Sequence, residues 1–267
     1  MTTVLKLGGE LLEDAAAVRG AADGIIRLAS RGPVAVVHGG GRAIDAELLH
    51  RGLTPRFADG LRVTDADTLD AVVTVLAGRT NTQLVAAVNA AGGKGVGLTG
   101  ADAQLGLCAP VAPVRTQSGE IVDLGLVGEP ESCNATILEE LLRGGYVPVV
   151  ASIGITADGT LLNVNADTFA AHLAAALSAD RLIVAGTTRG VLDAAGQTIP
   201  ALGEADIDAM TASGTAHSGM IAKLVACRHA VRHGVGEVSI VSGRDTVDFD
   251  SAPGTKIRAK AMAAAPR

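Results

Sequence analysis

A lysine stands at the end of the first predicted strand and is followed closely by two glycines, in the sequence Lys6-Leu7-Gly8-Gly9. A second glycine cluster, His38-Gly39-Gly40-Gly41, follows the second predicted strand and opens a helix near Arg42. Glycine has no Cβ atom, so backbone N–H groups can approach an anion closely there. A helix N-terminus adds a partial positive charge, worth about 0.3–1 kcal/mol at an exposed site. Either cluster alone is compatible with a tight turn, but two at the carboxyl ends of the first two strands predict a phosphate site.

Three polar residues at alternate positions, Asn163, Asn165 and Asp167, precede an alanine-rich helix. In an extended segment, alternate side chains point to one side. Asp167 alone would be interpreted as the N-cap of the helix. The three residues in register instead predict a polar wall of a site.

Lys223 lies near the start of another predicted helix, Ser218 to His233. A lysine in the first turn opposes the helix dipole, which is mildly unfavourable unless an anion is nearby. In the same helix, His229 and His233 have the i,i+4 spacing that can hold zinc. The sequence shows no third ligand, and cationic residues are favourable at a helix C-terminus. We therefore interpret the two histidines as a solvated face and expect no metal site.

A single arginine lies in the segment Gly60-Leu61-Arg62-Val63-Thr64, which we expect to be a loop between two helices. The planar guanidinium of arginine is suited to a bidentate grip on a carboxylate. An isolated arginine is also compatible with an ordinary surface position. Both interpretations of Arg62 stay open at this point.

The elements that must position these residues follow from an alternation of short apolar runs with longer helical stretches. Buried strands are predicted at Val4 to Leu7, Val34 to Val37, Val96 to Leu98, Val147 to Ile153, Leu182 to Ala185 and Val238 to Val241. Helices are predicted at Ala43 to Arg51, Ala66 to Ala91, Thr136 to Arg143, Asp167 to Leu177 and Ser218 to His233. This alternation predicts an α/β fold, a three-layer αβα sandwich around a mostly parallel open sheet.

One segment breaks the alternation of strands and helices. Val111 to Gly128 alternates with period two around Gln117-Ser118-Gly119, which predicts an inserted antiparallel β-hairpin. No Pro/Gly/Ser linker divides the chain, and the softest boundary lies near Leu177 to Asp180. We therefore expect one continuous fold of two lobes, residues 1–177 and 178–267, with a frayed tail over residues 259–267.

The composition excludes several functional classes. The 267 residues carry a net charge of -6 at pH 7, with 48% apolar and 1% aromatic residues. That hydrophobicity excludes a disordered chain, and the length allows a substantial core. The chain has no basic run and few aromatic rings on which bases could stack, so we expect no nucleic-acid partner. Small molecules are the expected substrates.

Cysteine usage and the N-terminus bear on the compartment. Cys108, Cys133 and Cys227 have no paired spacing, which favours buried thiols in a reducing cytoplasm. The chain begins with the strand-like run Val4 to Leu7, so we expect no signal peptide. The helix around Phe169 to Leu177, which we take as the most apolar, is too short to span a membrane. We expect a cytoplasmic protein without a membrane span.

Two familiar nucleotide motifs fail in this chain. No GxxxxGK[ST] sequence occurs. The run Gly95 to Gly100 matches GxGxxG, but it lies within a predicted strand instead of following one, and a hairpin comes next. A dinucleotide-dependent oxidoreductase is therefore disfavoured.

Taken together and in order, five motifs resemble those of the amino acid kinase family over about residues 3 to 257. They are Lys6 to Gly9, His38 to Gly41, Gly60 to Thr64, Asn163 to Asp167 and Gly219 to Lys223. Within the family, the third and fourth motifs are similar to those of members that phosphorylate the side-chain carboxylate of N-acetyl-L-glutamate. That reaction uses MgATP and is the second step of arginine biosynthesis.

The resemblance implies a role for each matching position. Lys6 and Lys223 would stabilise charge on the phosphoryl group in flight, and Asp167 would hold the two lysines in place. Backbone N–H groups of Gly9 and Gly41 would bind phosphoryl oxygens. The acetylated amino acid would be held by a second set of residues: Gly40, Gly41, Arg62 and Asn163.

The resemblance also divides the work between the lobes. The first lobe would bind the acceptor and form the dimer, and the second would bind nucleotide. The nucleotide would lie on Thr187, Thr188, Arg189, Gly190, Val191 and Leu192 and on Thr215, Ala216 and His217. Relatives often carry an aspartate where this chain has Thr187, so the detailed contacts there are expected to differ. Mg²⁺ is implied by the use of ATP and not by a visible metal motif.

Three further expectations concern assembly and alternatives. The chain lacks the N-terminal helical extension of arginine-inhibited hexameric members, so a homodimer insensitive to arginine is expected. A sister kinase acting on free or carrier-linked aminoadipate, glutamate or aspartate is the nearest alternative. A catalytically silent nucleotide-binding protein is the second, although such a protein has no chemical reason to keep Lys6, Asp167 and Lys223 together.

Overall fold

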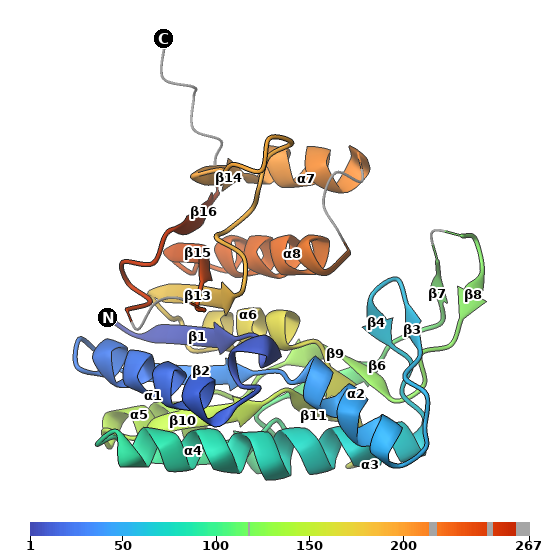
Figure 1. Cartoon of the computed structure of the whole chain (residues 1–267), viewed down its shortest axis with the longest axis horizontal. Helices are drawn as coiled ribbons and strands as arrows, with labels where there is room; N and C mark the ends of the chain where they lie inside the picture. Colours follow the sequence, from blue (N-terminus) through green and yellow to red (C-terminus); the bar gives the residue numbers. More distant parts are fainter. Residues whose placement is uncertain (117, 214–217, 245–247, 260–267) are drawn as a thin grey trace.

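The computed structural model describes residues 1–116, 118–213, 218–244 and 248–259. Its centre is one eight-stranded sheet (Figure 1). The strands are β1 (Thr3–Leu7), β2 (Val34–His38), β5 (Gly95–Thr99), β10 (Val147–Ala151), β13 (Arg181–Gly186), β14 (Ala201–Gly203), β15 (Glu237–Ser242) and β16 (Gly254–Arg258). They lie in the order β14-β16-β15-β13-β1-β2-β10-β5, and every neighbouring pair is parallel except β15 with β16. The mostly parallel open sheet is therefore confirmed.

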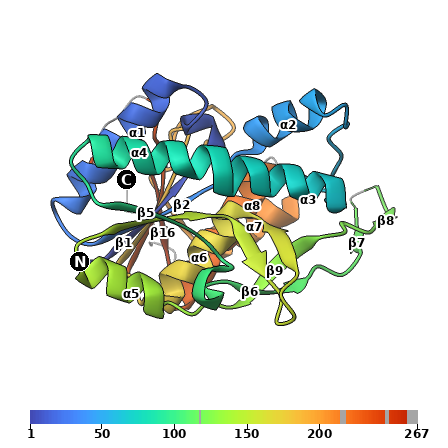
Figure 2. The same cartoon turned by 90° about the horizontal axis from the view of Figure 1, so that it is seen from below.

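Helices cover both faces of the sheet (Figure 2). One face packs against α1 (Ala15–Ala29) and α4 (Asn81–Ala90), and the other packs against α5 (Thr136–Arg143), α6 (Ala166–Ala176) and α8 (Ser218–Arg232). The strands supply both cores because successive side chains point to opposite faces. In β1, for example, Val4 packs with the α6 and α8 side while Leu5 and Leu7 pack with α1. A further helix, α7 (Glu204–Ser213), packs against α8.

A long helical rod runs over residues 66–90 (Figure 2). It consists of α3 (Ala66–Val73), the π-helical segment η2 (Thr74–Thr80) and α4. By length and a mean hydropathy of 1.2, the rod could cross a membrane, a candidate that our sequence analysis did not identify because it considered the helix at 169–177. Its Val75, Leu84 and Val88 are fully buried against the sheet and its neighbours. That packing is typical of a core helix, and length with composition alone is weak evidence for a membrane span.

A small barrel and two short hairpins stand beyond the carboxyl ends of the strands. β6 (Leu107–Pro110), β9 (Val127–Ser132), β11 (Ile153–Ile155) and β12 (Leu161–Val164) close into the barrel. The expected strand from Val147 to Ile153 is therefore two strands, because the chain leaves the sheet at Ser152 to enter the barrel. The predicted insertion contains the antiparallel pair β7 (Val114–Arg115) and β8 (Ile121–Val122), with Gln117 outside the described residues. A second pair is β3 (Phe57–Ala58) with β4 (Leu61–Arg62).

The sheet continues without a break across the expected lobe boundary at residue 177. β1, from the first lobe, pairs in parallel with β13, from the second, over Thr3–Leu7 and Arg181–Ala185. The connections also contain the α-helix α2 (Gly41–His50) and two short helical turns, η1 (Gly9–Leu11) and η3 (Asp102–Gln104). Of the expected frayed tail, residues 260–267 lie outside the described part of the chain.

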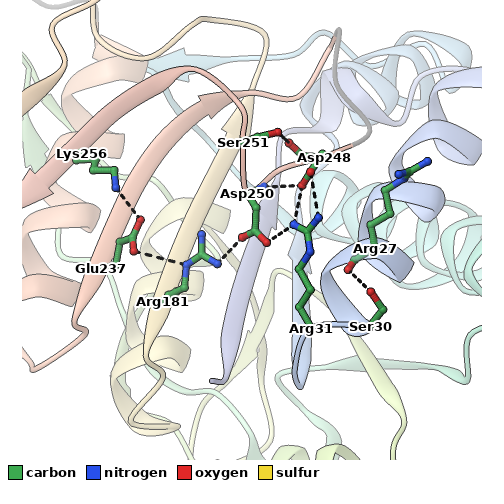
Figure 3. A network of polar contacts seen from close by, with 9 residues as sticks. All are labelled: Arg27, Ser30, Arg31, Arg181, Glu237, Asp248, Asp250, Ser251 and Lys256. Carbon is green, nitrogen blue, oxygen red and sulfur yellow. Dashed lines mark hydrogen bonds and ion pairs between the residues drawn. The ribbon is translucent and has the colours of Figure 1, made fainter.

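Ion pairs join the two expected lobes at the amino ends of the strands (Figure 3). We call this group the amino-end network, and it consists of Arg31, Arg181, Glu237, Asp248, Asp250 and Lys256. Arg31, just after α1, contacts Asp248 at 3.0 Å and also pairs with Asp250. Asp250 in turn pairs with Arg181 at the start of β13. Three cations face three carboxylates, so the network is neutral.

Candidate functional site

A cavity of about 240 Å³ opens at the carboxyl ends of β1 and β2. Parallel strands bring their carboxyl ends to one edge of a sheet, which is where ligands bind in open α/β folds. The wall of the cavity includes seven of the eight residues expected to act on the phosphoryl group or the acceptor: Lys6, Gly9, Gly40, Gly41, Arg62, Asn163 and Asp167. The eighth, Lys223, reaches this wall through an ion pair with Asp167.

The two lysines converge on one carboxylate. Lys6 Nζ lies 2.8 Å from Asp167 Oδ1, and Lys223 Nζ lies 3.4 Å from Asp167 Oδ2. The Lys6 and Asp167 side chains are 6% and 7% exposed, whereas the Lys223 side chain is 20% exposed. These three residues, which we call the lysine cluster, carry one positive charge in excess. A partly open cation beside a buried ion pair is an arrangement that attracts an anion.

Burial and charge act in opposite directions on Asp167. Burial disfavours its charged form and raises its pKa, but the Lys6 and Lys223 ammonium groups outweigh that effect. The net result is a lowered pKa, so the carboxylate is ionised at neutral pH. Asp167 also lies in the first turn of α6, where the helix dipole favours a negative charge.

The N-cap of α6 is Asn165 and not Asp167. Asn165 Oδ1 accepts hydrogen bonds from the backbone N–H groups of Asp167, at 2.9 Å, and Thr168, at 3.1 Å. The expected extended segment therefore ends at Val164, and Asp167 is already helical. Because Asn165 caps the helix, the carboxylate of Asp167 is left for the lysines. All three polar residues of the motif nevertheless line the cavity, so a polar wall is present.

Lys223 lies in the second turn of α8, not the first, because the helix begins at Ser218. Its chain approaches the end of β13, where a Cβ atom on Gly186 would lie 3.9 Å from Lys223 Cε. α6 and α8 pack closely against each other, and this packing brings Asp167 and Lys223 together. The pair thus connects the two expected lobes across the cavity.

The two glycine clusters touch each other. A Cβ atom on Gly9 would lie 2.6 Å from Gly40 Cα, and one on Gly40 would lie 2.7 Å from Leu76 Cδ2. Real Cβ atoms do not approach backbone atoms so closely, so glycine is required at position 9, whereas a side chain at position 40 would require Leu76 to move. α2 begins at Gly41 with Gly40 as its N-cap, and no side chain caps it. Its free N–H groups and positive dipole end can therefore bind an anion in the cavity.

Arg62 is buried, with 8% exposure, so its interpretation as an ordinary surface residue is wrong. Its Nη1 lies 2.7 Å from Asp45 Oδ1, and its Nη2 donates to the Gly41 carbonyl at 3.2 Å. The guanidinium also lies over the Phe57 ring, with its carbon 4.7 Å from the ring centroid. These contacts hold the cation against the start of α2, at the cavity wall.

The position of Arg62 depends on a hairpin that the sequence analysis interpreted as a loop. Phe57 pairs with Arg62 across β3 and β4. The turn between the strands is Asp59-Gly60, where φ is 46° and 86°. An Asp-Gly pair with two positive φ angles is typical of a tight two-residue hairpin. That dipeptide is the signal that could have predicted the hairpin.

Asn163 is tied to the same region. Its Nδ2 donates to Thr64 Oγ1 at 3.1 Å, and Thr64 Oγ1 donates to the Arg62 carbonyl at 3.0 Å. Thr64 is fully buried. The chain of bonds joins β12 to β4, so Asn163 and Arg62 form one side of the cavity together.

Two polar residues of the cavity were missed by the sequence analysis. Glu10 follows the first glycine pair, and its carboxylate lies over the chain at Gly8, where a Cβ atom would be 2.5 Å from Glu10 Oε1. Ser152 is buried and follows β10 directly. The available signal was position, since each residue stands at or just beyond the carboxyl end of a predicted strand.

The expected nucleotide segment begins directly after β13, beside Gly186 and Lys223. Thr188 and Arg189 are exposed there, and Thr187 is half-buried. Gly190 has a φ of 94°, and a Cβ atom on it would lie 2.5 Å from Thr255 Oγ1.

The last two residues of this segment, Val191 and Leu192, differ in how far a ligand could reach them. Val191 is buried, and its N–H donates to Thr255 Oγ1 while its carbonyl accepts from the Ile199 N–H. Both of its backbone groups are therefore used within the fold. Leu192 is 45% exposed. The other expected nucleotide residues, Thr215, Ala216 and His217, lie outside the described part of the chain.

The histidines of α8 are not a uniformly solvated face. His233 is exposed, but the His229 ring is stacked between His172 and His233, with centroids 3.9 Å and 4.0 Å away. The cause is the packing of α6 on α8, which brings His172 to His229. Burial lowers the pKa of His229 to about 4. Within the described ranges, no group of three or more His, Cys, Asp or Glu side chains is placed to hold a metal ion.

The GxGxxG match is accounted for by the sheet. Residues Gly95–Thr99 form β5, so the motif lies within a strand as expected. Gly97 is needed because Asn81 Oδ1 would lie 2.1 Å from a Cβ atom there. The motif is therefore a packing feature.

Sequence comparisons agree with this geometry. A model of the amino acid kinase family matches residues 1–242. An acetylglutamate kinase of Jannaschia sp. (strain CCS1) is 42% identical over 243 residues, covering 90% of this chain and 82% of that enzyme. An acetylglutamate kinase of Novosphingobium aromaticivorans is 40% identical over 254 residues, covering 91% and 84%.

Solved structures share the fold. An N-acetylglutamate synthase from Neisseria gonorrhoeae, complexed with coenzyme A and N-acetyl-glutamate, superposes with a TM-score of 0.82 at 22% identity. The superposition covers 98% of this chain and 60% of that one. A carbamate kinase from Giardia has a TM-score of 0.70 at 16% identity, covering 97% and 99%. At these identities the likeness concerns the fold alone.

Proposed function

Since the chain belongs to the amino acid kinase family, we propose that it transfers the terminal phosphoryl group of ATP to the side-chain carboxylate of N-acetyl-L-glutamate. The product is N-acetyl-L-glutamyl 5-phosphate, and the reaction is the second step of arginine biosynthesis. The observation that carries the proposal is the lysine cluster, with its excess positive charge, in one cavity with the open N-terminus of α2 and the buried Arg62. The acetylglutamate kinases at about 40% identity support the choice of acceptor.

Arg62 orients the acceptor in this scheme. Its guanidinium pairs with a carboxylate of N-acetylglutamate, and Asn163 and the backbone of Gly40 and Gly41 hold the rest of the molecule. Asp45 and Phe57 already fix the guanidinium, so little conformational freedom is lost when the acceptor binds. The side-chain carboxylate of the acceptor then points toward the lysine cluster.

Phosphoryl transfer depends on positioning and charge neutralisation more than on covalent chemistry. Lys6 and Lys223 stabilise the negative charge on the group in flight, and Asp167 holds both ammonium groups. The N–H groups of Gly9 and Gly41 bind phosphoryl oxygens. The acceptor carboxylate is ionised near neutral pH, so no general base is needed. The transfer is direct and in line, without a covalent enzyme intermediate.

The nucleotide lies on the second lobe. The segment Thr187 to Leu192 and residues 215–217 bind it, and Lys223 contacts its terminal phosphate. The described residues contain no preformed metal cluster, so we propose that Mg²⁺ enters bound to the nucleotide phosphates. The metal supplies additional charge neutralisation there. The division into an acceptor lobe, 1–177, and a nucleotide lobe, 178–267, belongs to the same proposal.

We also propose a cytoplasmic homodimer. The cysteines Cys108 and Cys227 are buried and unpaired, which suits a reducing compartment. The dimer is an expectation from the family resemblance, with the first lobe as the contact surface. Sedimentation of the purified protein tests it directly.

The function is tested by trapping the acyl phosphate with hydroxylamine. Purified protein is incubated with MgATP and N-acetyl-L-glutamate, and in parallel with free glutamate, aspartate or aminoadipate. Hydroxamate from N-acetylglutamate alone is expected. Turnover with another acid in its place would retain the mechanism and overturn the substrate. Nucleotide binding without any product would support a silent binding protein.

A further inference from the structure

A fully buried histidine stands directly before the second glycine cluster and has no role in the scheme above. His38 is the last residue of β2, and its exposure is 0%. Burial lowers its pKa to about 4, so the imidazole is neutral at physiological pH. A neutral imidazole has one N–H donor and one acceptor nitrogen, and its neighbours decide which nitrogen carries the proton.

The neighbours of His38 fix that choice. Asn81 Nδ2 lies 2.8 Å from the Val149 carbonyl, which can only accept, so the amide nitrogen must be on this side. The same nitrogen lies 3.1 Å from His38 Nε2. Because an amide nitrogen only donates, Nε2 must be unprotonated. The proton is therefore on Nδ1, which lies 3.2 Å from the Gly39 carbonyl and donates to it.

The bond to Gly39 controls the next peptide group. The Gly39 carbonyl and the Gly40 N–H belong to one planar trans peptide, so they point in opposite directions. An imidazole that holds the carbonyl on the buried side turns the Gly40 N–H toward the cavity. The Gly39 N–H is held as well, by the Leu7 carbonyl at 3.3 Å. Glycine itself has few conformational restraints, so the orientation of the Gly39–Gly40 peptide must be held by residues outside the glycine cluster.

The π-helical segment η2 brings Asn81 to His38. A π turn adds a residue to a helical turn and rotates the following side chains, and such turns are frequent at functional sites. The buried positions along the rod are Leu76, Thr80, Asn81, Leu84 and Val88, so both Thr80 and Asn81 turn inward where the π-helical segment ends. Leu76, on the same segment, packs against Gly40. The segment therefore supports the glycine cluster at two points.

We propose that Asn81 and His38 are positioning residues of the acceptor site. Asn81 holds His38 in its Nδ1–H form, and His38 orients the Gly39–Gly40 peptide so that the Gly40 N–H faces the acceptor. The catalytic importance of this arrangement rests on the proposed function. The tautomer itself does not, so the two can fail separately.

The first test compares the same substitution at two positions of α4. Asn81→Leu removes both N–H donors with little change in shape and adds no charge, so nothing holds Nε2 of His38 unprotonated and the bond to Gly39 is no longer enforced. Asn89 is exposed, and Asn89→Leu is the matched control. For N81L we expect kcat/KM for N-acetylglutamate to fall at least about tenfold, while KM for MgATP stays within about twofold. N89L should behave like the unsubstituted protein, and equal kinetics of N81L would overturn the proposal.

A second pair of variants separates positioning from packing. The amide of His38→Asn can occupy the place of Nδ1 and still donate to Gly39, whereas that of His38→Gln reaches the place of Nε2. We expect H38N to keep kcat/KM for the acceptor within about threefold and H38Q to lose at least about tenfold. Equal losses in both variants would assign His38 a packing role and overturn the proposal.

The third readout is independent of catalysis. In ¹⁵N NMR of histidine-labelled protein, with His38 assigned through H38N, we expect Nδ1 protonated and Nε2 unprotonated. An Nε2–H tautomer would overturn the inference even if the enzyme is active. If no acyl phosphate forms but the Nδ1–H tautomer is found, the proposed function fails while the hydrogen-bond assignment stands.

Discussion

Charged side chains gather at both ends of the central sheet, and the two groups are built differently. At the carboxyl end, the lysine cluster places two cations on one carboxylate, with Lys6 and Asp167 almost fully buried. At the amino end, three cations face three carboxylates, and the Arg31 side chain is 50% exposed. The first group has a net positive charge and is mostly buried, whereas the second, drawn in Figure 3, is neutral and on average more exposed.

The difference indicates that the lysine cluster serves to bind a ligand, whereas the amino-end network serves to stabilise the fold. A buried charge without full compensation is costly, so the cluster at the carboxyl end weakens the fold unless an anion arrives. The amino-end network has no such excess, and screened surface pairs contribute little each. Its effect is to join α1 with the segment before β16. Of these two groups, the one with the uncompensated charge lies at the carboxyl end of the sheet, beside the cavity.

The largest contrast is expected for lysines at the two ends. Lys6→Ala should lower kcat by about 10²–10³, or about 3–4 kcal/mol, because a charge contact to the phosphoryl group is lost. Lys256→Ala removes a lysine from the amino-end network and should leave kcat within about twofold. Steady-state kinetics of both variants measure the contrast. A near-normal kcat for K6A would remove Lys6 from the mechanism.

Acid should destabilise the two ends in different pH ranges. The pKa of His38 is about 4 in the fold against an ordinary value of 6.5, so above pH 6.5 it is neutral in both states. Between pH 6.5 and 4 the unfolded chain gains a proton that the folded chain cannot, and the free energy of unfolding falls by about 3 kcal/mol. Urea unfolding at pH 7, 5 and 4 should show this loss. In H38N the loss should be smaller but not absent, because the pKa values of His229 and His172 are also lowered in the fold.

At the amino end, acid also lowers the free energy of unfolding, but it does so in a lower pH range. Arg31 and Arg181 lower the pKa of Asp250, and Arg31 lowers that of Asp248, against the burial that opposes both shifts. Stability from these carboxylates is present above their ordinary pKa of 3.8 and is lost as the pH falls through their lower folded pKa values. If the unsubstituted protein and H38N unfold identically down to pH 4, the buried histidine is not responsible for the first loss.

Arg62 tests the acceptor side of the carboxyl end. Arg62→Ala should raise KM for N-acetylglutamate by about tenfold or more, with a smaller effect on kcat, because a ground-state contact is removed. Arg62→Lys keeps the charge and loses the planar fork, so an intermediate KM is expected. Initial rates at varied acceptor concentration measure both. An unchanged KM in R62A would reject the assigned contact.

The smallest effect is expected from the amino-end network. Asp250→Asn removes the carboxylate shared by Arg31 and Arg181, and Tm should fall by about 2–4 °C. The kcat value should stay within about twofold, since this end is remote from the cavity. Thermal unfolding at low and high salt checks the origin of the loss, because salt should reduce the difference. A large fall in kcat would show that the two ends are coupled.

The sequence predicted the fold best where local pattern and tertiary packing agree. The buried strands and the α/β alternation were recognisable because parallel strands covered on both faces are continuous apolar runs. α1 was missed because its Gly20 and Gly24 weaken the helical signal. The structure explains Gly24, since a Cβ atom there would lie 2.5 Å from Phe249 Cε2. A contact over such a separation in sequence cannot be read from a local pattern.

Prediction of the candidate site was limited in the same way, because its contacts depend on tertiary packing. Glycine clusters and lysines were visible as motifs, but Asp167 meets both lysines only after α6 packs on β1 and α8. The burial of Arg62 depends on Asp45 and Phe57, which come to it through a short hairpin. Sequence spacing identified the residue types, and tertiary packing determined which groups are partners.

The order of the strands has a consequence for synthesis of the chain. β14 has β16 as its neighbour in the sheet, and β16 also pairs with β15, so the strand made last lies between two made earlier. A growing chain that ends before Gly254 leaves β14 with no strand beside it and exposes the edge of β15. The outer part of the sheet can therefore assemble only after Gly254–Arg258 has been synthesised, and until then an unpaired strand edge is open to wrong partners.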